Sequence, residues 1–170
     1  MASRHIFVTV GSTKFDALIS QFFLPELLQA LKQRGFKHVR LQIGDGEIEP
    51  INKTLEGVHI TCFRFLPSIA DEIRRADLVL SHAGAGTCLE VLNAHKPLVA
   101  IVNKALMDDH QMELAEKLAS DGHLIYCDGP EKLLQVIETA DFSKLIPFPP
   151  GEPMKFSNFL DELMGFKSSR

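Results

Sequence analysis

A run of small residues, SHAGAGT at positions 81–87, has the composition of a turn that holds a phosphate group. It stands where a strand is expected to end and a helix to begin. Glycine lets the backbone approach a ligand closely, and the unpaired N–H groups at a helix start attract anions such as a diphosphate. The same glycines would also serve a tight turn that binds nothing. The turn is no dinucleotide fingerprint, because Leu89 takes the place of the third glycine, and the chain has no G-x-x-x-x-G-K-S/T phosphate loop.

Glu90 follows Thr87 by three residues, and this spacing has two explanations. In a capping box, the Thr87 hydroxyl and the Glu90 carboxylate would satisfy free N–H groups at the start of the helix. Alternatively, a carboxylate one turn into the helix would accept hydrogen bonds from both hydroxyls of a ribose whose phosphates lie on the turn. Spacing alone leaves both explanations open.

A second polar cluster, MDDHQ at positions 107–111, stands where another helix is expected to begin. Asp108 or Asp109 would serve as an N-cap, with His110 and Gln111 on the helix surface. Facing the 81–87 turn, His110 and Gln111 would instead supply a donor and an amide to a bound sugar nucleotide. A metal site is the weaker alternative, because the chain offers no matching carboxylate or cysteine partner, and no metal is predicted.

Alternating strands and helices must position these residues. We expect a helix at 15–34 that is interrupted at Pro25, a helix at 67–75 with Pro67 as its first residue, and irregular structure or one helical turn between 44 and 57. The remaining strands are expected at 5–10, 38–43, 58–65, 77–81, 97–102 and 123–127, and the remaining helices at 84–94, 108–120 and 130–139. This order predicts an α/β, Rossmann-like fold whose mainly parallel sheet carries helices on both faces. Ligands bind at the carboxyl ends of such strands, where both polar clusters lie.

Length, charge and cysteine content exclude several classes of protein. The 170 residues suit one domain, and 45% hydrophobic with 24% charged residues describe a globular chain. A net charge of −4 leaves no basic excess for nucleic acid, which we do not expect as a partner. Three well-separated cysteines favour neither a disulfide framework nor a zinc site. No signal peptide and no membrane-spanning segment are recognisable, so a cytoplasmic protein is expected.

The C-terminal part changes in character. Four prolines in residues 146–153 forbid regular structure and predict a linker after a domain at 1–145. In residues 154–170, Phe156, Phe159, Leu160 and Leu163 recur at helical spacing and predict an amphipathic helix. Its apolar stripe has three possible destinations, which are the chain's own core, a membrane surface or a partner.

Taken together, these motifs resemble a known family. The stretch SHAGAGTCLE at 81–90, with KPLV at 96–99 and DHQ at 109–111, is similar to the donor-binding, C-terminal half of GT-B glycosyltransferases that use UDP-GlcNAc. FVTVG at 7–11 and QIG at 42–44 extend the resemblance over roughly residues 6 to 127. Within that class the chain looks most like the small catalytic subunit of the two-chain transferases that add the second GlcNAc to dolichyl-diphosphate-GlcNAc.

The resemblance implies roles for individual residues. The turn at 84–87 would hold the diphosphate, Glu90 the ribose hydroxyls, and His110 and Gln111 the GlcNAc end or the phosphates. No general base is obvious, and His82 and His110 are the candidates for a catalytic residue. The residues expected to bind substrate are Gly11, Ser12, His82, Gly84, Ala85, Gly86, Thr87, Glu90, Asp109, His110 and Gln111.

The resemblance also implies partners. A GT-B enzyme binds donor and acceptor between two Rossmann-like domains, and this length supplies one. The expected partner is therefore a membrane-anchored, acceptor-binding subunit that recruits the chain to the cytosolic face of the endoplasmic reticulum, with no cofactor. Two alternatives are a nucleotide-sugar-binding module without activity and a UDP-GlcNAc epimerase, which normally has both domains in one chain. An NAD dehydrogenase is disfavoured because the first strand is followed by no glycine fingerprint.

Overall fold

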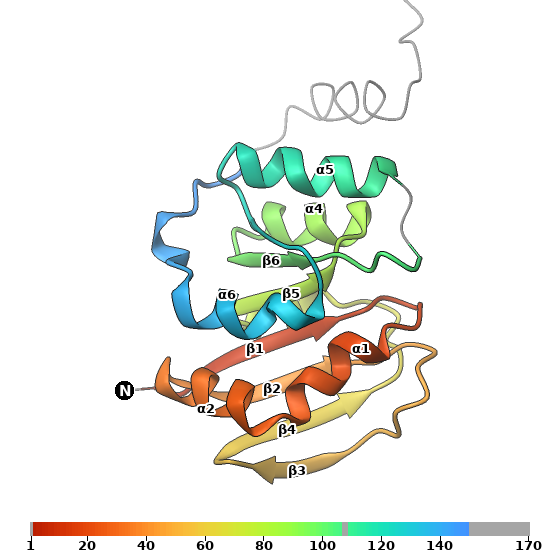
Figure 1. Cartoon of the computed structure of the whole chain (residues 1–170), viewed down its shortest axis with the longest axis vertical. Coiled ribbons are helices and arrows are strands. Elements are labelled where there is room, and N and C mark those ends of the chain that lie inside the picture. Colours follow the sequence, from red (N-terminus) through yellow and green to blue (C-terminus); the bar gives the residue numbers. More distant parts are fainter. Residues whose placement is uncertain (1, 107–108, 150–170) are drawn as a thin grey trace, which may run out of the picture.

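The fold is built on one twisted sheet in the order β3-β4-β2-β1-β5-β6-β7 (Figure 1). The computed structural model describes residues 2–106 and 109–149, without the side chains of Asp109 and His110. Every neighbouring pair of strands is parallel except β3 with β4. The strands are β1 (Arg4–Thr9), β2 (Phe36–Gln42), β3 (Asn52–Leu55), β4 (Val58–Phe63), β5 (Leu78–His82), β6 (Leu98–Ile101) and β7 (Ile125–Cys127).

Helices cover both faces of the sheet, as right-handed crossovers require. One layer holds α1, α2 and α6, and the other holds α3, α4 and α5. The helices are α1 (Asp16–Ile19), α2 (Pro25–Gln33), α3 (Ala70–Arg75), α4 (Ala85–Asn93), α5 (Asp109–Ser120) and α6 (Leu133–Thr139), with 3₁₀ turns η1 (Ser20–Phe23), η2 (Pro130–Lys132) and η3 (Phe142–Lys144). The expected Rossmann-like α/β fold is therefore confirmed.

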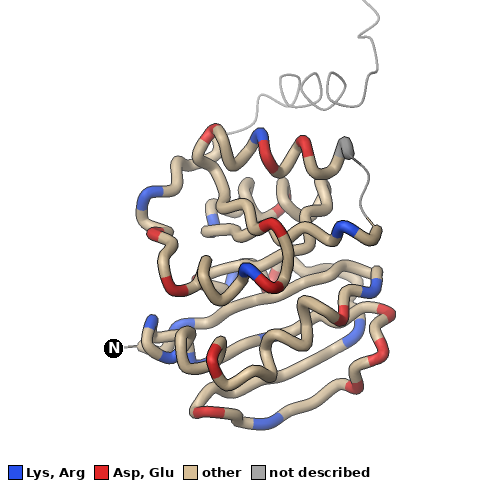
Figure 2. Tube along the Cα trace, viewed as in Figure 1, with Lys and Arg blue, Asp and Glu red and all other residues tan. Residues whose placement is uncertain are grey.

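Alternation along the strands divides the core in two. In β1, Ile6 and Val8 face α1 and α2, whereas Phe7 faces the layer of α3, α4 and α5. The three neighbouring strands β5, β6 and β7 contain no Lys, Arg, Asp or Glu (Figure 2). Strands of a parallel sheet are buried on both faces, so continuous apolar runs such as residues 98–102 are the expected pattern.

Two expected elements differ from the structure. The segment between 44 and 57 was expected to be irregular or to form a helical turn, but it contains β3, which pairs antiparallel with β4. Its residues Asn52, Lys53 and Thr54 are exposed, so the strand has no buried apolar face that its sequence could signal. The helix expected from Pro67 begins at Ala70, because the Ser68 hydroxyl accepts the Ala70 N–H (3.3 Å) while the preceding residues form a loop.

Pro25 acts as predicted. It is the first residue of α2 and separates that helix from α1 and η1. Directly after α2, the Nη1 atom of Arg34 donates hydrogen bonds to the carbonyl oxygens of Ile137 and Ala140, both at 2.7 Å. The guanidinium also lies 4.8 Å from the centre of the Phe142 ring. Arg34 thus satisfies free carbonyls at the end of α6 and ties that helix to α2, against which it packs.

The start of the proline-rich segment lies against the domain. The Ile146 N–H donates to the Gly122 carbonyl (2.9 Å), and the rings of His123 and Phe148 meet edge to face at 5.2 Å. The second half of the expected linker and the whole amphipathic helix at 154–170 fall in residues 150–170, outside the described residues. The three-part division of the chain stays a prediction. Within residues 2–106 and 109–149, no helix has the length and apolarity needed to span a membrane.

Candidate functional site

A pocket of about 290 Å³ opens at the carboxyl ends of β1 and β2, beside the start of α4. We call it the donor pocket, after the donor-binding role that the sequence leads us to expect. It brings together residues from the loop after β1, the end of β2, the loop after β4, and α4. Its lining consists of Gly11, Ser12, Gln42, Phe65, Leu66, Pro67, Ser68, Ile69 and Glu90. Three residues predicted from the sequence, Gly11, Ser12 and Glu90, thus share one cavity.

The turn after β5 presents the open start of a helix. Gly84 is the N-cap of α4, and no side chain in the described part of the chain caps it. Ala85, Gly86 and Thr87 form the first turn, whose N–H groups have no partner within the helix. A Cβ at Gly86 would have nothing within 4 Å, so the space beside this residue is open in the described part of the chain. This geometry suits an anionic group bound to backbone N–H groups.

The capping-box explanation for Glu90 is wrong. Thr87 lies inside α4, three residues after the N-cap, so its hydroxyl does not occupy the capping position. Glu90 is exposed, lines the donor pocket, and has no hydrogen-bond partner among the described residues. Its carboxylate is therefore available to a ligand in that pocket.

His82 fills the space between two turns of the site. A Cβ at Gly84 would lie 2.6 Å from its Nε2, and a Cβ at Gly11 would lie 3.1 Å from its Cε1. The Nδ1 atom is 3.4 Å from the Thr9 carbonyl oxygen. Burial lowers the pKa of His82 from its usual 6.5, an effect that the Thr9 carbonyl opposes. A neutral imidazole at pH 7 follows, which positions the two glycine turns and is able to accept a proton.

A buried polar pair supports the loop after β1. The Thr9 hydroxyl donates to the Gln42 side-chain oxygen at 2.6 Å, and the Gly11 N–H donates to the same hydroxyl at 3.0 Å. Gly11 has a φ of +64°, a conformation that favours glycine. The pair fixes the backbone at Gly11 and holds the Gln42 amide at the wall of the donor pocket.

Three loops are joined at this edge of the sheet. The Nη1 atom of Arg64 donates hydrogen bonds to two carbonyl oxygens, those of Gly44 (3.2 Å) and Gly46 (2.8 Å). The Asp45 N–H donates to the Thr13 carbonyl (3.2 Å), which connects the loop after β2 to the loop after β1. Gly44 is required here, since its φ is +57° and a Cβ would collide with the Thr13 carbonyl oxygen. The loop that carries Ser12 is therefore held from two sides.

The predicted cluster at 109–111 lies at the start of α5. Because β5 and β6 are parallel neighbours, the turn that begins α4 and the loop that leads to α5 lie at the same edge of the sheet. Gln111 is an exposed residue of α5. The side chains of Asp109 and His110 lie outside the description, so their contacts with substrate and the candidacy of His110 as a catalytic residue stay predictions.

Sequence reasoning missed the apolar wall of the donor pocket. Phe65 is 64% exposed and stands beside Leu66 and Ile69 in the loop after β4. Burying an aromatic side chain is favourable, so an exposed phenylalanine at the wall of a pocket offers a surface on which a planar group could pack. The available signal was an aromatic residue directly after a strand end. Gln42 was also missed as a wall residue, although its motif was noted.

The part of the chain that the structure describes offers neither a metal site nor a reactive thiolate. No three His, Cys, Asp or Glu side chains among the described residues are grouped to hold a metal ion. All three cysteines are free thiols. Burial raises the pKa of Cys88 to about 12 and that of Cys127 to about 11, so neither is a thiolate at neutral pH.

Comparison with known proteins agrees with this geometry. Residues 5–163 match the glycosyltransferase family 28 C-terminal domain. The chain is 46% identical over 122 residues to the UDP-N-acetylglucosamine transferase subunit ALG13 of Homo sapiens, a match that covers 72% of this chain and 11% of that protein. The subunit of the same name from Saccharomyces cerevisiae is 30% identical over 192 residues, covering 94% of this chain and 95% of the yeast protein.

Solved structures share the fold. The NMR structure of ALG13 superposes with a TM-score of 0.70 at 28% identity and covers 93% of this chain and 95% of that one. MurG from Acinetobacter baumannii gives a TM-score of 0.61 at 26% identity, over 85% of this chain and 43% of MurG. The match thus spans about a tenth of the human relative's length but nearly the whole yeast protein. The chain belongs to the glycosyltransferase family 28 C-terminal domain family, with the Rossmann-like fold of the C-terminal half of a GT-B glycosyltransferase.

Proposed function

We propose that this chain is the donor-binding, catalytic subunit of an N-acetylglucosaminyltransferase that uses UDP-GlcNAc. One observation carries the proposal: the donor pocket unites an exposed aromatic side chain, an unpaired carboxylate and the loop after β1 beside the open start of α4. A nucleoside diphosphate offers a matching set of groups, namely a planar base, two ribose hydroxyls and a diphosphate. The relatives' name, UDP-N-acetylglucosamine transferase subunit, supports both the donor and the need for a partner.

Each part of the donor has a place in this proposal. The uracil ring packs against Phe65, and the Glu90 carboxylate accepts hydrogen bonds from the ribose hydroxyls. The N–H groups at Gly84–Thr87 and the Ser12 loop hold the diphosphate. His110 and Gln111 reach the GlcNAc end or the phosphates from the start of α5. The donor pocket alone is sized for the nucleoside, so the sugar extends toward the acceptor side.

The chemistry follows from this arrangement. A hydroxyl of the acceptor attacks the anomeric carbon of GlcNAc, the bond from that carbon to the diphosphate oxygen breaks, and UDP leaves with the electron pair. Backbone N–H groups at the start of α4 stabilise the negative charge that grows on UDP. The proton of the attacking hydroxyl goes to a base, for which His110 and the neutral imidazole of His82 are the candidates.

The acceptor side comes from a second protein in this proposal. The chain supplies one Rossmann-like domain, whereas GT-B transferases bind their two substrates between two such domains. We assign the acceptor as dolichyl-diphosphate-GlcNAc, the step as the second GlcNAc addition in lipid-linked oligosaccharide assembly, and the partner as a membrane-anchored, acceptor-binding subunit. The complex would then work at the cytosolic face of the endoplasmic reticulum.

Calorimetry and a transfer assay test the proposal separately. The purified chain should bind UDP-GlcNAc and UDP but not ADP, and should transfer little GlcNAc to dolichyl-diphosphate-GlcNAc by itself, because half a cleft cannot orient both substrates. Adding membranes that contain the partner should produce transfer. No binding of UDP-GlcNAc would refute the donor assignment. Binding without transfer in the presence of the partner would make the chain a binding module, and conversion of UDP-GlcNAc without acceptor would make it an epimerase.

A further inference from the structure

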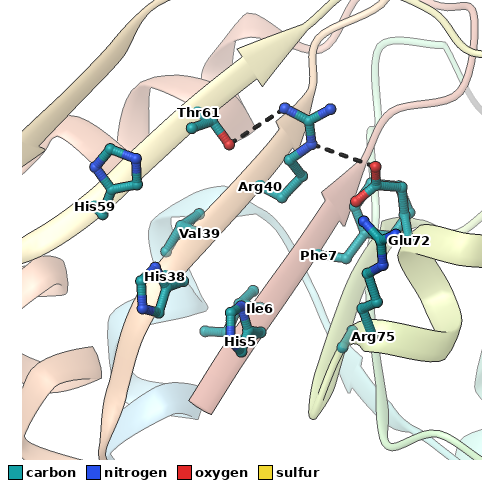
Figure 3. A pocket seen from close by; sticks show the side chains of 11 residues that line it. His5, Ile6, Phe7, His38, Val39, Arg40, His59, Thr61, Glu72 and Arg75 are labelled. Atoms are coloured by element: carbon teal, nitrogen blue, oxygen red, sulfur yellow. Dashed lines mark hydrogen bonds and ion pairs between the residues drawn. The ribbon is translucent and has the colours of Figure 1, made fainter. Parts of the chain in front are cut away.

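A second pocket lies on the sheet face that α3 covers only in part. Its volume is about 250 Å³, and it shares no lining residue with the donor pocket. Its walls come from β1, β2, β4 and α3 (Figure 3). We call it the histidine pocket, because His5, His38 and His59 line it.

Strand register brings the three histidines side by side. His5 lies opposite His38 in the parallel pairing of β1 with β2, and His38 lies opposite His59 in that of β2 with β4. Two residues farther along, Arg40 and Thr61 project from the same face, because side chains alternate along a strand. The helix α3 has only six residues and packs against β1, and in the part of the chain that the structure describes, the side chains of β2 and β4 on this face stay partly exposed.

The rings form a continuous row. The ring centres of His5 and His38 are 4.5 Å apart, and the two planes are nearly parallel at 12°. His59 meets His38 edge to face, with centres 6.1 Å apart. The three rings thus line one side of the pocket (Figure 3), and the Nδ1 atom of His59 also lies 3.2 Å from the Thr54 hydroxyl of β3.

Two guanidinium groups complete the lining. Arg40 makes two long hydrogen bonds, from Nε to the Glu72 carboxylate and from Nη1 to the Thr61 hydroxyl, both at 3.4 Å. A guanidinium has five N–H donors, so Arg40 keeps donors for a further acceptor. Arg75 is exposed at the pocket, and residues 2–106 and 109–149 offer it no hydrogen-bond or ion-pair partner. Glu72 is the one carboxylate in the lining.

We propose that the histidine pocket binds a tetrahedral oxyanion, a phosphate group in particular, through Arg75, Arg40 and protonated histidine. Guanidinium groups recognise phosphate oxygens with paired, charge-assisted hydrogen bonds, and imidazolium adds donors at the other side of the pocket. The donors outnumber the acceptors in the lining, and a neutral or cationic ligand would leave them unsatisfied. The pocket is distinct from the donor pocket, so the proposal does not depend on UDP-GlcNAc binding.

Binding should strengthen as the pH falls through the histidine range. Burial lowers the pKa of His38 from its usual 6.5, and the positive charges of His5, His59 and Lys37 lower it further. Glu72 and Arg75 face the rings from α3, and the Asp77 carboxylate accepts the backbone N–H of His5 at 2.8 Å. An anion bound among the rings raises the pKa of the histidines, because its negative charge stabilises their protonated form. Binding of the anion is therefore coupled to protonation of the histidine rings.

Proton NMR of the full chain tests the proposal. Inorganic phosphate and sulfate, added separately at a pH of about 6, should shift the ring signals of His5, His38 and His59 in a saturable manner. Sulfate keeps its charge over this range, so the pH dependence of its binding reports the protein's groups. Sulfate affinity should fall about tenfold or more toward a pH of about 8.

The chain provides a matched pair of arginine variants. Arg75→Gln should weaken phosphate binding about tenfold, since one charge-assisted pair is lost. Arg74→Gln removes the same charge from the same exposed helix but disrupts only the pair with Asp71 at 2.6 Å, so it should leave phosphate binding unchanged. Equal effects of the two variants, or no saturable shift of the three ring signals, would overturn the proposal. An unchanged melting temperature of Arg75→Gln would show that the variant is folded.

Free phosphate and a lipid headgroup offer the same chemistry, and vesicles distinguish them. Phosphatidylcholine vesicles with and without phosphatidic acid are mixed with the chain at a pH of about 6 and sedimented. The lining groups lie in a recess between the strands and α3 rather than on a protruding surface, which favours a free phosphate group, so the chain should stay in solution with both kinds of vesicle. Sedimentation with phosphatidic acid that Arg75→Gln abolishes would identify the phosphate source as a headgroup and overturn the assignment to a free phosphate.

Discussion

The two glycines at the start of α4 differ in what a side chain would meet. A Cβ at Gly84 would collide with the His82 ring, whereas a Cβ at Gly86 would enter open space. Gly84 is therefore required by the packing of the protein itself. No contact among the described residues requires a glycine at position 86, and the absence of a side chain there would let a ligand approach the backbone.

Gly86→Val tests this difference. Valine forms helices somewhat better than glycine, so the melting temperature should stay the same or rise slightly. The isopropyl group would occupy the space of the diphosphate, and the affinity for UDP-GlcNAc should fall more than tenfold in calorimetry. Asn93→Val, at the exposed last residue of the same helix, is the control and should bind normally. Full affinity of Gly86→Val would exclude the turn as the diphosphate site.

Glu90→Gln tests the ribose contact. The amide keeps one acceptor but loses the charge, which should weaken UDP binding by about tenfold and leave the melting temperature unchanged. The variant should also bind UDP and its 2′-deoxy analogue with nearly equal affinity, whereas the original chain should prefer UDP. Glu138→Gln, an exposed carboxylate of α6, provides the control. A preserved preference for UDP in Glu90→Gln would remove Glu90 from the ribose.

At the scale of elements, the sequence predicted what depends on strong local patterns. The buried strands, the helix start at Pro25 and the turn after β5 each carry such a pattern. The strand β3 does not, because its exposed residues gain their order from pairing with β4 rather than from burial. The histidine row was equally hidden, because strand register between distant segments is set by the crossovers that join them.

The contact between α2 and α6 is predicted to be a main stabilising link. Arg34→Ala removes two hydrogen bonds from a charged donor and leaves two carbonyl oxygens at the end of α6 without that partner. The free energy of unfolding should fall by about 2–3 kcal/mol in urea denaturation. Arg34→Lys should recover only part of the loss, because an ammonium cannot also lie flat on the Phe142 ring. An unchanged unfolding free energy for Arg34→Ala would contradict this role.

At the scale of the whole molecule, two histidines predict the direction of the pH dependence. The pKa values of His38 and His82 are both lowered from 6.5, chiefly by burial. The unfolded chain therefore binds more protons than the folded chain between the lowered values and about pH 6.5, and the free energy of unfolding should decrease as the pH falls through this range. Urea denaturation at a series of pH values measures this slope, which His82→Gln should reduce. Increasing stability toward lower pH would contradict the prediction.

The hydrogen bonds from Arg34 to the end of α6 also have a consequence for folding during synthesis. Its two acceptors are 103 and 106 residues farther along the sequence. During synthesis, α2 emerges early, but the surface it later shares with α6 has no partner until nearly the whole sheet has been translated. The layer of α1, α2 and α6 is thus the last part of the fold to be completed. Until then, the surface of α2 that α6 will cover is exposed in the nascent chain to chaperones or to other chains.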